Sequence, residues 1–91
     1  MGAKAEISWK GRTADGFKRD VYAKRVGGEW RFFARRKRYD PWQPLSDPPL
    51  EDWLELLDAV QRRIARRRLR PDEEARLRKT IRERFPQVEF S

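Results

Sequence analysis

Two adjacent glycines, Gly27 and Gly28, separate two runs of alternating sequence and constrain the fold more than any other feature. The run FKRDVYAKRV occupies residues 17–26, and EWRFFARRKRY occupies residues 29–39. Glycine accepts the positive φ angles that a two-residue hairpin turn requires. The sequence therefore predicts that the two runs pair as antiparallel strands joined by Gly27 and Gly28.

This turn also predicts which side chains share a face of the sheet. If the two glycines form the loop, Val26 lies opposite Glu29, and side chains alternate between the faces from there. One face then holds large apolar side chains beside small ones and is expected to be the core, with Ile7 or Trp9 added by an earlier strand. The pairs predicted for this core face are Arg25–Trp30, Ala23–Phe32, Val21–Ala34 and Arg19–Arg36.

The opposite face is predicted to combine an aromatic pair with several cations. Its cross-strand pairs are Lys24–Arg31, Tyr22–Phe33, Asp20–Arg35 and Lys18–Lys37. Directly opposed like charges destabilise a sheet by roughly a few tenths of a kcal/mol or more. Two such pairs on one face indicate that an anion neutralises them.

The rest of the chain predicts one more strand, a connector and two helices. An alternating run covers residues 6–10, and Thr13 to Gly16 supply turn chemistry before the second strand. Residues 40–49 contain four of the six prolines and predict a stiff connector that is neither a helix nor a central strand. Trp42 and Leu45 are expected to pin this connector onto the core.

A helix is predicted over residues 50–69, with Asp47 as its N-cap and Pro48 at its first position. A second helix, over 71–85, is predicted between Pro71 and Pro86, and the tail 86–91 is expected to fray rather than add an edge strand. The apolar face of the first helix is predicted to be Leu50, Trp53, Leu54, Leu57, Val60 and Ile64, and that of the second Leu77, Ile81 and Phe85.

The predicted fold is α+β: a three-stranded antiparallel meander over 6–39, the proline-rich connector, and a C-terminal helical hairpin packed on one sheet face, in the order β-β-β-α-α. It is expected to be a single small basic domain spanning 1–91. In element order, residues 6–68 resemble the DNA-binding domains of the plant ethylene-response-factor type and the arm-site domains of phage integrases. Those domains insert a three-stranded sheet into the major groove. The resemblance rests on element order and assigns no residue a role.

Composition narrows the classes of function. The chain has 23 cations and 15 anions, a net charge of +8, and neither cysteine nor histidine. Thiolate and histidine metal sites are therefore excluded, as is the side chain best suited to proton transfer near neutral pH. Acids at the start of the first helix have a structural explanation in the helix dipole. We expect no catalytic site, no metal and no cofactor, and a cytoplasmic protein without a membrane-spanning segment.

The excess of positive charge points to a polyanionic partner, although arginine, at 17 residues against six lysines, would also be frequent in a GC-rich genome. The basic sheet face could be neutralised by the acidic residues 40–61, which carry −6, by an external phosphate backbone, or by solvent alone. The arginine-rich run 62–70 either complements the helix dipole or forms a phosphate-contacting ridge.

Two functions follow from this pattern. The first is a non-enzymatic nucleic-acid-binding module, DNA or RNA, in which cations contact phosphates and two aromatic rings stack on bases. The alternative is a protein-interaction or assembly module that pairs acidic with basic surfaces, as a complex with an acidic protein or as a homodimer. The residues predicted to bind nucleic acid are Lys18, Tyr22, Lys24, Arg31, Phe33, Arg35, Lys37, Arg62, Arg66 and Arg67.

Overall fold

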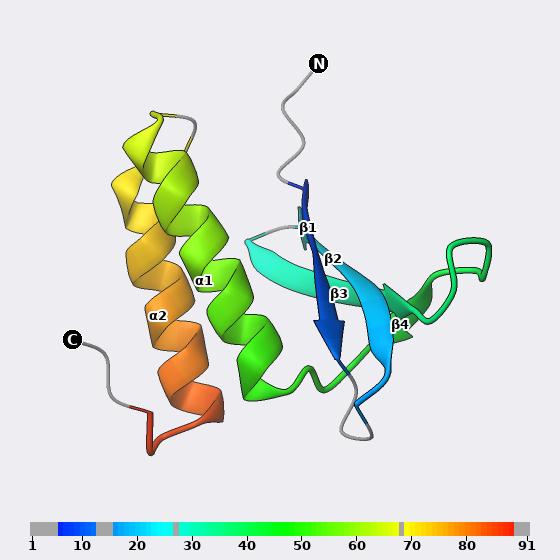
Figure 1. Ribbon diagram of the computed structural model, residues 1–91. Helices are drawn as coiled ribbons and strands as arrows, with labels where there is room; N and C mark the ends of the chain where they lie inside the picture. Colours follow the sequence, from blue (N-terminus) through cyan, green and yellow to red (C-terminus); the bar gives the residue numbers. More distant parts are fainter. Residues whose placement is uncertain (1–5, 13–15, 27, 68, 89–91) are drawn as a thin grey trace. The chain divides into compact units, whose positions relative to one another are not determined.

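The computed structural model describes residues 6–12, 16–26, 28–67 and 69–88. The chain is an α+β protein that divides into two compact units, Met1–Pro48 with the sheet and Pro49–Ser91 with the helices. The elements are β1 (Glu6–Arg12), β2 (Lys18–Val26), β3 (Glu29–Arg35), β4 (Gln43–Leu45), α1 (Leu50–Ala65) and α2 (Pro71–Arg84) (Figure 1).

The first three strands form the predicted antiparallel meander, and the sheet order is β1-β2-β3-β4. The predicted register of β2 with β3 is confirmed along the whole ladder, from Val26 opposite Glu29 to Asp20 opposite Arg35. Gly28 has a φ of +90°, the left-handed conformation that motivated the hairpin prediction. Gly27 and the predicted turn residues 13–15 lie outside the described residues.

The two outermost pairs predicted for this ladder are wrong, because β3 ends at Arg35. Arg36 and Lys37 lie beyond the ladder, so neither Arg19–Arg36 nor Lys18–Lys37 is a strand pair. The Lys37 amide donates to Oδ2 of Asp40 at 3.1 Å, and the Asp40 amide donates to the Lys37 carbonyl at 3.0 Å. These two hydrogen bonds close a tight turn over residues 37–40, and the chain does not continue as a strand there.

The proline-rich connector contributes a fourth, short strand that the sequence did not predict. In β4, Leu45 lies opposite Phe32 and Pro44 opposite Phe33. Proline lacks an amide donor, but an edge strand has one row of backbone groups without a partner strand, so it tolerates proline. The connector was correctly excluded as a central strand, and its pairing makes the sheet four-stranded rather than three-stranded.

The predicted core face is confirmed at its centre, whereas Trp30 and Ala34, also predicted for it, are half-buried. The buried apolar side chains on it are Ile7, Val21, Ala23 and Phe32, each at most 4% exposed. Both Ile7 and Trp9 belong to this face, because β1 places them opposite Ala23 and Val21. The half-buried Trp9 ring meets Phe32 edge-on at 5.8 Å, a favourable aromatic geometry.

The two helices run antiparallel beside each other (Figure 1). In α1 the buried apolar residues are Trp53, Leu56, Leu57 and Val60, whereas Leu54 is 39% exposed. The prediction therefore placed Leu54 on the wrong side of the apolar stripe and missed Leu56. Both positions flank the stripe defined by Trp53, Leu57 and Val60, and periodicity alone does not decide between them. In α2, Leu77 and Ile81 are buried as predicted, and Phe85 is half-buried.

The ends of α1 differ from the prediction. The N-cap is Pro49 without a side-chain cap, so Asp47 does not cap the helix and Pro48 lies before it. The helix ends at Ala65 rather than 69, because Arg67 adopts the left-handed conformation, with φ 60°. Pro71 starts α2 as predicted, and α2 ends at Arg84, one residue early. Residues 89–91 of the tail lie outside the described part.

A polar contact ties α1 to α2. Nε2 of Gln61 donates to Oε2 of Glu74 at 3.0 Å, and Arg78 reaches the same oxygen through Nε at 2.8 Å and Nη2 at 2.7 Å. The hydrogen bond from Gln61, then that from Arg78, lowers the pKa of Glu74 below its ordinary value. The ionised carboxylate is therefore the form that stabilises the helical hairpin.

We predict that Arg67→Gly stabilises the protein. The left-handed conformation strains a residue with a Cβ but not glycine, so the free energy of unfolding should rise by about 0.5–1 kcal/mol. Urea denaturation followed by far-UV circular dichroism measures this. Arg66→Gly is the matched control, because Arg66 has an ordinary φ of −93° and glycine there should give no gain. An equal effect of both substitutions would contradict the explanation.

We predict that Glu74→Gln lowers the free energy of unfolding at neutral pH by roughly 0.5–1 kcal/mol, the range of a partly exposed ion pair. Because folding lowers this pKa, the contribution of Glu74 is complete above the unfolded-state pKa and is lost as the pH falls through the folded-state pKa. Denaturation curves of both proteins should thus converge in acid. Glu83→Gln, an exposed change on the same helix, is the control. A difference that persisted at low pH would refute the assignment.

Candidate functional site

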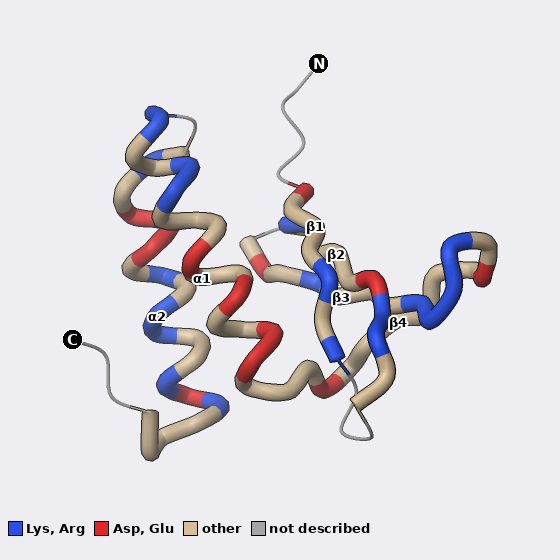
Figure 2. Tube along the Cα trace, in the orientation of Figure 1, with Lys and Arg blue, Asp and Glu red and all other residues tan. Residues whose placement is uncertain are grey.

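One face of the sheet gathers cations from three neighbouring strands, and we call it the basic face. Figure 2 shows where lysine and arginine residues lie along the chain. It is the face opposite the buried Val21, Ala23 and Phe32. Its acids are Glu6, Asp20 and Glu29. The strand cations that the register places on it are Lys10, Arg12, Lys18, Lys24, Arg31 and Arg35.

The sequence predicted four of these six strand cations and missed Lys10 and Arg12. Both lie on β1, where Lys10 is opposite Asp20 and Arg12 is opposite Lys18. The turn before β2 does not reveal its loop length from sequence, so the register of β1 was open. The basic face nevertheless contains two like-charged cross-strand pairs. The pair Lys24–Arg31 was predicted, and the pair Arg12–Lys18 was not.

Asp20 holds the middle of the basic face together. Its Oδ1 lies 3.6 Å from Nζ of Lys10 on β1, and its Oδ2 accepts a hydrogen bond from Nε of Arg35 on β3 at 3.3 Å. The side chains of Asp20 and Arg35 are 27% and 24% exposed, whereas that of Lys10 is 84% exposed. The carboxylate therefore fixes Arg35 in position and leaves most of Lys10 in solvent.

Three aromatic rings form a cluster on the same face. The predicted neighbours Tyr22 and Phe33 stack with centroids 4.9 Å apart and an angle of 16° between planes. Trp42 meets Tyr22 edge-on at 4.6 Å and 85°. Trp42 was expected against the core, but it lies two residues before Pro44, and the alternation of β4 places both on the basic face.

Two cations of the basic face lie over these rings. Cζ of Arg35 is 4.2 Å from the centroid of Trp42, and Nζ of Lys24 is 5.6 Å from that of Phe33. Such contacts stabilise by about 0.5–2 kcal/mol, depending on solvent exposure. All three rings are half-buried, so much of their surface is engaged within the protein. Their clearest role is to hold Arg35 and Lys24, and stacking of Tyr22 and Phe33 on bases stays a prediction.

The turn between β3 and β4 carries an aromatic residue that the sequence did not single out. Tyr39 is 91% exposed, and Cζ of Arg38 lies 6.0 Å from its ring centroid. Arg36 and Lys37 precede them in the loop that leaves the end of β3 (Figure 1). Tyr39 was assigned to the strand run 29–39. The signal that was missed is Asp40, three residues after Lys37, because an aspartate side chain can accept a hydrogen bond from a nearby backbone amide and so compete with strand pairing.

The predicted arginines of the helical unit lie at the end of α1. Arg62, Arg66 and Arg67 are all exposed. Arg62 forms an i,i+4 ion pair with Asp58 at 3.3 Å. The amides of Arg66 and Arg67 cap the helix by donating to the carbonyls of Arg62 and Ile64. They are a second group of cations, which belongs to the helical unit and not to the sheet.

No protein-family model, curated protein or solved structure matches this chain. Within the described residues, no helix is long and apolar enough to cross a membrane. The same part of the chain contains no group of three or more aspartate or glutamate residues arranged to hold a metal ion.

We predict that Trp42→Ala destabilises the protein by about 1–2 kcal/mol, because it removes a half-buried ring that packs on Tyr22 and supports Arg35. Tyr39→Ala serves as the control, since a ring that is 91% exposed should contribute no more than about 0.5 kcal/mol. Thermal and urea denaturation of the two variants measure the difference. Equal stabilities would mean that the aromatic cluster does not support the sheet.

Proposed function

We propose that this protein is a non-enzymatic nucleic-acid-binding module. The observation that carries the proposal is the basic face itself, with six strand cations and three acids across β1, β2 and β3. Phosphate backbones are bound mainly by lysine and arginine, and the release of counterions drives that binding. A flat array of cations on neighbouring strands suits a chain of phosphates.

The distribution of charge along the chain supports this proposal. Residues 1–48 contain 12 cations and six acids, a net charge of +6, whereas residues 49–91 contain 11 cations and nine acids, a net charge of +2. Three quarters of the positive excess therefore belongs to the sheet unit. This concentration favours electrostatic attraction of a polyanion to the sheet.

Each part of the site would then have a separate task. Arg31 is exposed and Lys10 almost wholly so, and both would contact phosphates directly. Arg35, held by Asp20 and Trp42, would contribute a fixed guanidinium group. Tyr39 is the most exposed of the large apolar side chains in the described residues and would stack on an unpaired base.

We predict salt-sensitive binding to mixed-sequence DNA and RNA, measured by fluorescence anisotropy with oligonucleotides that end in hydroxyl groups. For duplex DNA, the slope of log affinity against log salt should be about −3 to −5, at roughly −0.9 per neutralised phosphate. Replacing Arg31 and Arg35 together by Gln should weaken binding and make this slope about two units shallower. The reason is the loss of two phosphate contacts.

Arg76→Gln with Lys79→Gln is the matched control. It removes the same charge from exposed positions on α2 and should leave the slope within about one unit of the parent protein. If the control pair weakened binding as much as the sheet pair, net charge rather than the basic face would be responsible. Absence of any binding below roughly 100 µM at about 50 mM salt would refute the proposal.

One observation favours assembly between charged surfaces as the alternative. Residues 51–58 of α1 expose Glu51, Glu55 and Asp58, which a basic face on another molecule would attract (Figure 2). A homodimer of this kind would form at low salt without nucleic acid and dissociate as salt screens the charges. Light scattering at low salt separates the two functions, because a monomeric mass eliminates the homodimer.

A further inference from the structure

The turn between β3 and β4, residues 36–40, presents a tyrosine ring to solvent. Tyr39 is 91% exposed, whereas Phe17, the next most exposed aromatic side chain in the described part of the chain, is 55% exposed. Single exposed apolar side chains are common on protein surfaces and need no ligand to explain them. The exposure of Tyr39 therefore becomes informative only through the groups around it.

Two hydrogen bonds close the turn on which Tyr39 lies. The Asp40 amide donates to the Lys37 carbonyl at 3.0 Å, and the Lys37 amide donates to Oδ2 of Asp40 at 3.1 Å. Tyr39 lies between these two residues in the chain, so its backbone belongs to a closed turn. Ordering a loop on binding costs free energy, and a turn that is already closed reduces that cost. The ring is thus presented from a defined backbone position.

The turn is also strongly basic. Arg36, Lys37 and Arg38 immediately precede Tyr39, and all three are exposed. Cζ of Arg38 lies 6.0 Å from the Tyr39 ring centroid, at the outer limit of a cation–π contact. Because the side chain of Tyr39 is 91% exposed, this contact leaves most of the ring surface in solvent. An anionic ligand with a flat ring would meet both charge and aromatic surface here.

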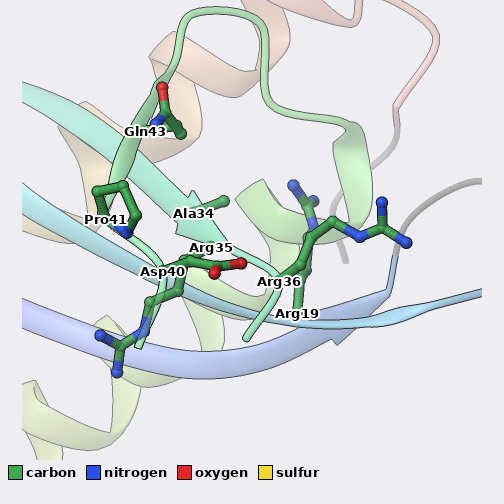
Figure 3. A pocket seen from close by; sticks show the side chains of 7 residues that line it. All are labelled: Arg19, Ala34, Arg35, Arg36, Asp40, Pro41 and Gln43. Atoms are coloured by element: carbon green, nitrogen blue, oxygen red, sulfur yellow. The ribbon is translucent and has the colours of Figure 1, made fainter. Parts of the chain in front are cut away.

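The end of β3 sends its cations to two sides. Figure 3 shows that Arg35 and Arg36, although consecutive in the chain, point in opposite directions. Arg35 lies on the basic face, where it is bound to Asp20. Arg36 instead lies against Phe17, with its Cζ 5.0 Å from the ring centroid. Positive charge therefore continues from the basic face into the turn beyond it.

An open hollow of about 440 Å³ lies beside this turn. Lys18 of β2 and Lys37 of the turn both line it, although the two are not paired in the ladder. Like charges that border one space repel each other, and a phosphate between them removes that repulsion. The hollow is lined by Phe17, Lys18, Arg36, Lys37 and Asp40.

A ring beside a phosphate-sized group of cations is the combination that binds single-stranded nucleic acid. There, bases stack on aromatic side chains while cations follow the backbone. In a duplex the flat faces of the bases are covered by neighbouring base pairs, so an exposed ring on a protein finds little to stack on. An unpaired base offers its face to Tyr39, and the adjoining phosphate can reach Lys18 and Lys37.

We propose that the turn and its hollow bind an unpaired nucleotide, and that the protein consequently prefers single-stranded to duplex nucleic acid. The base would stack on Tyr39, and its phosphate would lie against Lys18 and Lys37. This inference rests on the proposed nucleic-acid binding and names the class of strand that is bound. The basic face attracts phosphates of either class, and the turn distinguishes between them.

The test compares a thymine homopolymer, which does not pair with itself, with the same strand annealed to its adenine complement. A surface that acts through charge alone would favour the duplex, whose phosphates are more densely spaced. Anisotropy titrations at one salt concentration should instead show about tenfold tighter binding of the single strand, the gain from one stacked base. Tighter binding of the duplex by the parent protein would overturn the proposal.

Three variants assign the preference to the ring. Tyr39→Ala should abolish it, and the protein should remain folded because so exposed a ring contributes little to stability. Tyr39→Phe keeps the aromatic face and should preserve the preference. Arg31→Gln is the charge control, because it removes a cation of the basic face and should weaken binding of both oligonucleotides by a similar factor. An unchanged preference in Tyr39→Ala would contradict the proposal.

NMR provides a readout of stacking that does not depend on affinity. The chain has two tyrosines, so the ring signals of Tyr39 are identified by their loss in Tyr39→Phe. Adding the single strand should shift these signals upfield, because a stacked base shields the ring protons. Ring signals that do not move at saturation would show that Tyr39 is not stacked, and would overturn the proposal.

Failure of this inference is distinguishable from failure of the proposed function. If both oligonucleotides bind, but the duplex binds as tightly as the single strand and Tyr39→Ala changes nothing, nucleic-acid binding stands and the role of the turn fails. If neither oligonucleotide binds below roughly 100 µM at about 50 mM salt, both proposals are eliminated.

Discussion

The antiparallel pairing of β2 with β3 is the constraint on which the rest of the sheet unit depends. With Val26 opposite Glu29, every second residue of both strands faces one way. A slip by one residue would put Val21, Ala23 and Phe32 into solvent and bury the charged set instead. The same hydrogen-bond ladder therefore builds the buried face and assembles the basic face. A change of register would therefore alter core packing and surface charge together.

The sequence predicted the parts that local chemistry determines. Turn glycines and alternating side chains were enough for the meander, the β2–β3 register, the buried face and the Tyr22–Phe33 neighbours. They could not predict β4, because a three-residue strand containing Pro44 has no periodicity of its own and exists only by pairing with β3. The register of β1 against β2 could not be predicted from the sequence either. Lys10 and Arg12 were therefore missed as members of the basic face.

Other discrepancies have a common origin in single side chains that override a pattern. Asp40 bends the backbone at Lys37 and so ends β3 before the predicted strand does. Arg67 ends α1 by adopting a conformation that the helical periodicity does not reveal. Trp42 follows the alternation of β4 rather than the general tendency of tryptophan to be buried. None of these three features can be read from the periodicity of the sequence.

The aromatic cluster restricts the motion of two cations on the basic face. Arg35 is held by a carboxylate on one side and an indole ring on the other, and Lys24 lies over Phe33. Long cationic side chains usually lose considerable rotamer freedom when they bind a ligand. Cations that are already held in place lose less of it, so the cost of ordering falls before a ligand arrives. In the proposed complex with nucleic acid, the rings would therefore favour binding even where they do not touch the ligand.

The proline at the centre of β4 affects whether other molecules can add strands to this sheet at high protein concentration. Pro44 stands in an outer strand of only three residues and offers no amide hydrogen to a neighbouring molecule. The opposite outer strand, β1, presents Glu6, Lys10 and Arg12 along its length. Short, charged or proline-containing borders discourage strands of other chains from extending a sheet. This lean sheet is thereby protected at both margins against growth into fibrils.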